Sequence, residues 1–259
     1  EFAPKFLAMH PKEAVVAIVA ATEGFVAREH PPSTNQQFFE LDISGRTVRL
    51  QEDWSYVWAH SPDKTYGHDA DALILELLKF LRSAEQSMAK NVVEQIIADA
   101  GFAIFWSRIF LVAAERNDSL VDLLLPIAMA EPFLMVADTR KDAIDLVAVG
   151  YDRLSMEERT TFETAVGVFD FSRFDEPEAA RAYFLHRVFS AIGKSRLATE
   201  AAQSTLVENK SADVIDQGNN ERLFTLTTTT GEPEPFHWIK DLDRGSSVDQ
   251  VLMRAINDA

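Results

Sequence analysis

The chain has 259 residues, of which 47% are hydrophobic and 25% charged, so it is long enough to bury one or two hydrophobic cores. Its formal net charge is -16, and such an acidic surface repels nucleic-acid backbone and anionic lipid. It contains no cysteine, which excludes disulfides, thiolate catalysis and cysteine-ligated zinc. We therefore expect a cytoplasmic protein that binds neither nucleic acid nor membrane.

The N-terminal part predicts one helix followed by a β-hairpin. Apolar residues recur at helical spacing over residues 12–29, and Pro31-Pro32 ends this helix. From 38 to 50 the period changes to two, with apolar and polar residues alternating on both sides of a turn at Ser44-Gly45-Arg46. Because a lone hairpin is marginally stable in water, we expect it to pack against helices.

An aromatic patch follows the predicted hairpin directly. It consists of Trp54, Tyr56, Trp58 and Tyr66. Trp and Tyr dominate the hot spots of protein interfaces, so the patch is a candidate for an exposed recognition surface. The alternative is that these rings wedge the hairpin against the helices, and we favour this second interpretation.

The same stretch offers a candidate metal site at His60, His68, Asp69 and Asp71. Imidazole and carboxylate groups suit a zinc or manganese ion, or general acid–base catalysis. The alternative is that Asp69 caps the next helix, Asp71 complements its dipole, and the histidines are loop residues. We favour this alternative, since no H-E-x-x-H or comparable spacing is present.

Three helices are predicted after the aromatic patch. The first is capped by Asp69, the second spans about 88–100, and the third spans about 103–116. The third is apolar nearly all round, which predicts that it is the most buried helix.

The central part of the chain predicts further short helices with tight connections. Asp118 is expected to cap one of them, and Pro126 to end or kink it. Asp138 is expected to begin the next helix, and Gly150 to end that helix in the left-handed conformation. Short connections make these helices neighbours in space.

Two more helix starts carry capping patterns. Ser155 and Glu158 form an S-x-x-E capping box. Asp175 and Glu178 repeat that pattern, with Pro177 in the first turn. A weaker helix is expected at about 196–209.

Several charged residues of the central part have two interpretations. Asp138, Arg140, Asp145, Arg153 and Arg159 could line a groove, or they could form surface ion pairs that contribute little. No cluster of lysine and arginine in the sequence indicates a basic groove. The motifs of phosphate-binding loops and serine hydrolases are absent from the sequence.

The C-terminal part differs in composition. We expect residues 1–210 to form the helical domain, and 211–259 to be an irregular segment that ends in a short helix and packs on the same domain. Within it, the loop Thr227–His237 and Trp238 combine aromatic side chains with irregular backbone. His237 and Trp238 are therefore added to the candidate binding residues.

The successive helices resemble a helical-repeat region of HEAT type. The segment Asp138-Thr-Arg-Lys-Asp-Ala-Ile-Asp-Leu-Val is similar to the start of the second helix of such a repeat, and the resemblance covers about 69–210. The hairpin and the threonine-rich segment depart from the pattern. The chain is also similar to C-terminal helical regions of large bacterial multidomain proteins of the signal-transducing NTPase kind. This resemblance implies a scaffold arm whose nucleotide site lies elsewhere, and it assigns no functional residue.

We predict a mainly α fold of about nine to eleven helices. They should stack as antiparallel pairs in a HEAT-like solenoid or an irregular bundle, with one small β-hairpin at about 38–50. Since the chain begins with Glu1-Phe2 and not with methionine, we expect a fragment of a larger bacterial protein.

We predict a non-catalytic scaffold or protein-interaction module without a cofactor. Its partner would be another protein, or other domains of the same polypeptide, and the acidic surface favours a neutral or basic one. The oligomeric state is open. The alternatives are a metal-dependent enzyme that uses His60, His68 and Asp69, and a small-ligand-binding helical domain.

Overall fold

A computed structural model describes residues 2–31 and 36–208, and it confirms the mainly α prediction. Within these ranges the helices are α1 (Phe2–Met9), α2 (Pro11–Glu29), α3 (Ser55–Trp58), α4 (Asp69–Ser83), α5 (Gln86–Asp99), α6 (Ala103–Arg116), α7 (Ser119–Ala128), α8 (Glu131–Met135), α9 (Ala137–Gly150), α10 (Met156–Gly167), α11 (Pro177–Ile192) and α12 (Glu200–Glu208). The strands are β1 (Phe38–Ile43) and β2 (Arg46–Gln51), and short 3-10 turns lie at Tyr151–Arg153 and Lys194–Arg196. The predicted segment 211–259, with His237 and Trp238, lies outside the described residues.

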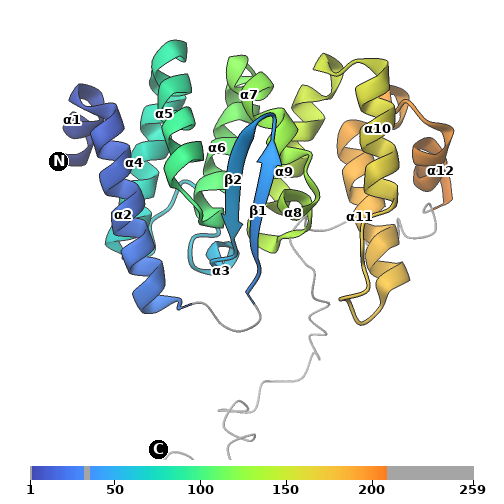
Figure 1. Cartoon of the computed structure of the whole chain (residues 1–259), viewed down its shortest axis with the longest axis horizontal. Coiled ribbons are helices and arrows are strands. Elements are labelled where there is room, and N and C mark those ends of the chain that lie inside the picture. The colour runs from blue at the N-terminus through green and yellow to red at the C-terminus, as the bar shows by residue number, and fades with distance from the viewer. Residues whose placement is uncertain (1, 32–35, 209–259) are drawn as a thin grey trace, which may run out of the picture. The chain divides into compact units, whose positions relative to one another are not determined.

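The described helices follow one another in chain order across Figure 1. The first pair, α1 and α2, packs on α4 and α5, and these two pack in turn on α6 and α7. Next, α9 packs on α6 and α7, α11 packs on α9, and α12 packs on α11. Many of these contacts are antiparallel, as predicted. Among the described helices, none has the length and apolar character that a membrane crossing needs.

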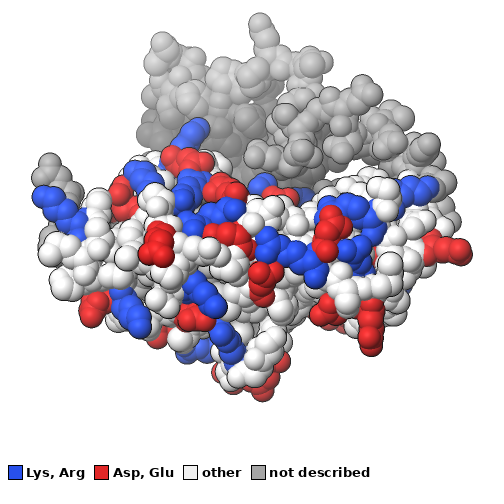
Figure 2. All heavy atoms as spheres, turned by 90° about the horizontal axis from the view of Figure 1, so that it is seen from above, with Lys and Arg blue, Asp and Glu red and all other residues white. Residues whose placement is uncertain are grey.

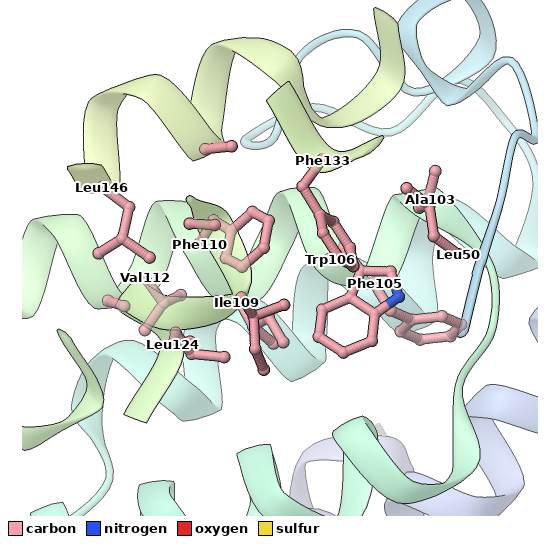
Figure 3. Close-up of a cluster of buried hydrophobic side chains, with 14 of the residues drawn as sticks. Leu50, Ala103, Phe105, Trp106, Ile109, Phe110, Val112, Leu124, Phe133 and Leu146 are labelled. Atoms are coloured by element: carbon pink, nitrogen blue, oxygen red, sulfur yellow. The ribbon is translucent and has the colours of Figure 1, made fainter. Parts of the chain in front are cut away.

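The core is centred on α6, which has buried residues on every side, as its all-round apolar pattern predicts. Its Trp106 ring lies 5.0 Å from the Phe133 ring in an edge-on arrangement, and Phe110 lies 5.6 Å from Phe133. Figure 3 shows Trp106, Phe110 and Phe133 close together among other buried side chains of the core. Edge-on aromatic packing of this kind contributes beyond the buried area alone. The helix therefore provides a rigid centre for the elements around it.

The hairpin is fastened to α5 and α6. Its strands pair from Phe38 opposite Gln51 to Ile43 opposite Arg46, around the positive φ angles of Ser44 and Gly45. Val48 and Leu50 of β2 are buried. Trp106 Nε1 donates to the Arg49 carbonyl at 2.8 Å, and Gln51 N donates to the Gly101 carbonyl at 2.8 Å. These contacts supply the packing that an isolated hairpin lacks.

The C-terminal helices are held by a buried carboxylate that the sequence did not reveal. Glu163 of α10 accepts from the Tyr151 hydroxyl, from Ala198 N at 2.7 Å and from Thr199 N at 2.7 Å. Arg159 lies over the buried Tyr151 ring at 5.1 Å. The carboxylate thus joins the start of α12 to α10.

Two predicted caps are confirmed. Asp118 accepts from Leu120 N at 2.9 Å, and Ser155 and Glu158 form the complete capping box. By contrast, Asp69 is the first residue of α4 and not its cap, and α11 is preceded by Glu176 without a side-chain cap.

Of the two effects predicted for Pro126, an end or a kink of the helix, the end is wrong. This proline lies inside α7, which continues to Ala128. It is exposed and close to the helix end, so its missing amide interrupts little.

Gly150 has a different role from the predicted left-handed helix end. Its φ angle is -82°, and it is the last residue of α9. A Cβ at this position would lie 2.8 Å from Val121 Cγ1 and 3.0 Å from the Leu125 methyl groups. Glycine is thus required because α7 and α9 approach each other closely here.

We expect Gly150→Ala to destabilise the fold by about 1–3 kcal/mol, because the added methyl group overpacks this contact. Gly24→Ala is the matched control: Gly24 lies in α2 with nothing within 4 Å of its added Cβ. The control should stabilise the helix by up to about 1 kcal/mol. Urea denaturation measures both, and equal effects of the two variants would contradict the role assigned to Gly150.

Candidate functional site

Most predicted binding residues lie in the segment 52–68 between β2 and α4. Its first half, which includes α3, is anchored on two buried carboxylates, Asp53 and Asp138. The sequence indicates neither residue as a buried anchor. It gives no pattern around Asp53, and it predicts that Asp138 begins a helix and lines a groove or forms a surface ion pair.

Asp53 joins this segment to α6. One carboxylate oxygen accepts from Ser55 N at 2.9 Å and the other from Ile104 N at 2.8 Å. Ile104 belongs to the first turn of α6, whose amides have no partner within the helix. In addition, Trp58 Nε1 donates to the Asp53 carbonyl at 2.8 Å. A single buried residue therefore satisfies amides of two separate elements.

Asp138 joins the same segment to α9. Its carboxylate accepts from Tyr56 N at 3.0 Å, from Asp53 N at 3.3 Å and from the Ser55 hydroxyl at 3.3 Å. The backbone from Asp53 to Tyr56 is thus held between the starts of α6 and α9.

The two carboxylates influence each other's protonation. Burial, and then the charge of Asp138, raises the pKa of Asp53 to about 7. Burial likewise raises the pKa of Asp138. Two neighbouring buried carboxylates resist double ionisation, so the pair retains a proton well above the usual pKa of an aspartate.

The end of α3 is held by a second buried group. Arg108 of α6 donates to the Ala59 carbonyl and to the Ser107 hydroxyl at 3.0 Å. Ser107 donates in turn to Asp142 of α9. Burial lowers the pKa of Arg108 and raises that of Asp142. Consequently α3 is fixed at both ends.

This anchoring divides the aromatic patch into a buried and an exposed part. Trp58 is only 7% exposed, lies 5.3 Å from the Phe25 ring and stacks on His30 at 5.5 Å. Trp58 thus packs α3 against the end of α2, while its predicted role as a wedge for the hairpin stays a prediction. Trp54 and Tyr56, by contrast, are 48% and 49% exposed, and Val57 is 58% exposed.

We call Trp54, Tyr56 and Val57 the aromatic platform. Trp54 has a φ angle of 58°, a left-handed conformation that costs about 1–2 kcal/mol for a residue with a Cβ. The exposed, strained position persists because the buried hydrogen bonds on either side determine the backbone. Phe38, whose strand partner is Gln51, adds another exposed ring near the start of the segment.

The predicted metal residues form separate contacts. His60 Nε2 lies 2.9 Å from the Tyr66 hydroxyl, and Tyr66 N donates to the buried Asp71. The His68 ring lies 5.1 Å from Phe25, and Asp69 is exposed at the start of α4. In the ranges that the structure describes, no group of three or more His, Asp or Glu residues could hold a metal ion. The metal site stays a prediction that this arrangement does not support.

The charged residues predicted to line one groove are spread along α9, the turn after it and α10, and Asp145 in the middle of α9 pairs with Lys141 at 3.1 Å. Asp138 and Arg140 belong to the first turn of α9, whereas Arg153 follows its end and pairs with Asp122 at 2.8 Å. Arg159 lies 3.6 Å from Asp152. Figure 2 shows acidic and basic side chains interspersed on one face. Such exposed pairs contribute little to stability.

The structure contains a group of three arginines, Arg140, Arg173 and Arg187, of which the sequence pointed only to Arg140. Arg140 and Arg173 both donate to the Met135 carbonyl, at 2.6 and 3.1 Å. The charge of Arg187 acts on Arg140 as well. These residues lie in α9, in the loop before α11 and in α11, so no local run of basic residues could reveal them.

Comparisons of this chain with protein-family models, with curated proteins and with solved structures give no match. No family therefore supports the HEAT-like assignment, and a function must be argued from the side chains themselves.

We expect Trp54 to be the quenchable indole among those in the described ranges. In a Trp238→Phe background the remaining indoles are Trp54, Trp58 and Trp106, and the last two are buried. Acrylamide should quench one accessible component of the fluorescence. Trp54→Phe should remove this component and Trp58→Phe should leave it. Quenching that survives Trp54→Phe unchanged would show that the platform is covered.

The raised pKa of Asp53 predicts how stability depends on pH. Between about pH 4, where an unfolded aspartate ionises, and about pH 7, the folded protein retains a proton that the unfolded chain releases. The free energy of unfolding should therefore fall as pH rises through this window, by up to about 1.4 kcal/mol per pH unit for one proton.

Asp53→Asn, which is neutral throughout, should flatten this slope in urea denaturation at several pH values. Asp175→Asn is the control, because Asp175 is exposed, and it should retain the slope. A slope unchanged in Asp53→Asn would assign the proton to another group.

Proposed function

We propose that this chain is a non-catalytic protein-interaction module and that the aromatic platform is its binding surface. The observation that carries the proposal is the exposure of Trp54, Tyr56 and Val57 on a backbone fixed by Asp53 and Asp138. Trp54 leaves about half of its surface exposed, and another surface that covers it would bury this apolar area.

The anchoring also favours tight association. A surface that is already ordered loses little conformational entropy when it binds, so more of the contact energy appears as affinity. Trp and Tyr on such a surface are the residue types that supply most binding energy in protein interfaces. The platform therefore combines suitable side chains with a preorganised backbone.

We further propose that the helices serve as a scaffold, as in HEAT-like repeat proteins, and that the chain acts within a larger protein. The succession of packed helices, in which α2 contacts α4 and α5, α4 contacts α6, and α9 contacts α11, supports this scaffold role. The metal-dependent enzyme and the small-ligand-binding domain stay alternatives, and no contact among the described residues favours either.

A randomised heptapeptide library displayed on phage tests the platform without a known partner. Selection on the full chain should enrich a set of sequences that contain aromatic or aliphatic residues. Trp54→Ala should weaken binding of the enriched peptides at least tenfold, equivalent to about 1.4 kcal/mol, because truncating a hot-spot tryptophan removes its buried contact.

Met156→Ala is the matched control, since Met156 is also exposed but lies at the start of α10. It should bind the peptides like the unchanged chain. Absence of any enriched sequence, or equal binding by Trp54→Ala, would refute the platform as a binding surface. Circular dichroism should verify that both variants retain the helical fold.

A further inference from the structure

The three arginines form a local concentration of positive charge in a chain whose net charge is -16. Arg140 Nη2 and Arg173 Nη2 donate to the same carbonyl oxygen, that of Met135, so their guanidinium groups are neighbours. Burial, and then the charges of Arg187 and Arg173, lowers the pKa of Arg140 to about 10. Like charges held this close repel each other unless an anion compensates them.

Within residues 2–31 and 36–208, no carboxylate forms an ion pair with any of the three arginines. Glu52 and Asp170 are the acidic groups whose charges act on them. Glu52 accepts from Gln37 N at 3.0 Å, and Asp170 accepts from Ser172 N at 2.8 Å. Both carboxylates are thus engaged by backbone amides.

The arginine group is continuous with the aromatic platform. Arg173 donates to the side-chain oxygen of Gln37, next to the exposed Phe38. Gln37 and Glu52 exchange backbone and side-chain hydrogen bonds, and Glu52 stands two residues before Trp54. Arg140 in turn stands two residues after Asp138, whose carboxylate accepts a hydrogen bond from Tyr56 N. The exposed Tyr183 of α11, which is electrostatically linked to Arg140, belongs to the same region.

We propose that Arg140, Arg173 and Arg187 receive a carboxylate of the protein segment that docks on the aromatic platform. The proposal rests on the function proposed above and adds the chemistry of the partner: an acidic side chain next to an apolar one. Guanidinium groups bind carboxylates through paired, charge-assisted hydrogen bonds. The compensating anion that the described chain does not supply would thus come from the partner.

This inference departs from the expectation of a neutral or basic partner, which follows from net charge alone. Net charge governs the field far from the molecule, and salt screens that field within about 10 Å. At contact distance the local guanidinium groups dominate. An acidic segment would therefore be attracted by the site even though the chain as a whole is acidic.

The library selection also tests this inference. Peptides enriched on the unchanged chain should contain Asp or Glu close to an aromatic or aliphatic residue. Arg187→Gln should lose the acidic preference and bind the enriched acidic peptide about tenfold more weakly, as expected for a lost charge-assisted hydrogen bond. The fold should tolerate this change, because Arg187 has no hydrogen bond or ion pair with another described residue.

A double-mutant cycle separates direct contact from a general charge effect. Replacing the acidic residue of the peptide with its amide should cost the same factor on the unchanged chain and almost nothing on Arg187→Gln. Arg173→Gln is the second variant, with its thermal unfolding checked because it loses the bond to Met135. Arg28→Gln is the control of equal charge, since the ion-pair partner of Arg28 within the described residues is its exposed neighbour Glu29.

The outcomes are distinguishable. Peptides that depend on Trp54 but carry no acidic preference, or that bind Arg187→Gln unchanged, overturn the carboxylate site and leave the platform intact. If the unchanged chain enriches no peptide, both the carboxylate site and the aromatic platform are refuted. If sedimentation shows self-association that Trp54→Ala abolishes, the occupant is a second copy of the chain and the assignment to a separate partner fails.

Discussion

The buried hydrogen bonds of Asp53 and Asp138 are the constraint on which the rest of this structure depends. Three elements meet at these two side chains: the segment after the hairpin, the start of α6 and the start of α9. The segment and the start of α6 bring the backbone amides that need acceptors, whereas the start of α9 brings the carboxylate of Asp138. Removing either carboxylate would leave these donors buried without acceptors, which costs more than a single hydrogen bond contributes.

Burying two carboxylates together is itself unfavourable, and hydrophobic side chains at these positions would avoid that cost. Hydrophobic side chains could not, however, fix the backbone from Asp53 to Tyr56. The polar arrangement selects one conformation of this segment, and that conformation presents Trp54 and Tyr56 to solvent. The buried carboxylates therefore lower the stability of the fold here, but they fix the conformation of the segment that carries Trp54 and Tyr56. Strain of this kind is often found at functional sites.

The sequence predicts local structure well where the cause is local. Helical periodicity revealed α2, α4, α5 and α6, period-two alternation revealed the hairpin, and the capping box at Ser155 follows from residues three apart. Gly150 shows the limit of such reasoning. Its conformation is ordinary, and its reason is the proximity of Val121 in another helix.

The candidate site was predicted only in part, for the same physical reason. Trp54 and Tyr56 could be identified by residue type, yet nothing local distinguishes them from Trp58, which is buried. Asp53 and Asp138 are 85 residues apart, and Arg173 reaches Gln37 across 136 residues. Only the tertiary packing brings these groups together, so no sequence spacing indicates them.

The separation of Asp53 and Asp138 along the chain determines when the backbone of the aromatic platform becomes fixed during folding. Some helix contacts, such as that of α8 with α9, join consecutive elements and can form rapidly because the loop between them is short. The contact that fixes Trp54 cannot form until α9 has been synthesised and packed. On a ribosome, the hairpin and the first helices would emerge and collapse while the segment carrying Trp54 still lacks its anchor. The long-range carboxylate contact thus delays the ordering of the aromatic platform until the helical body that supports it is in place.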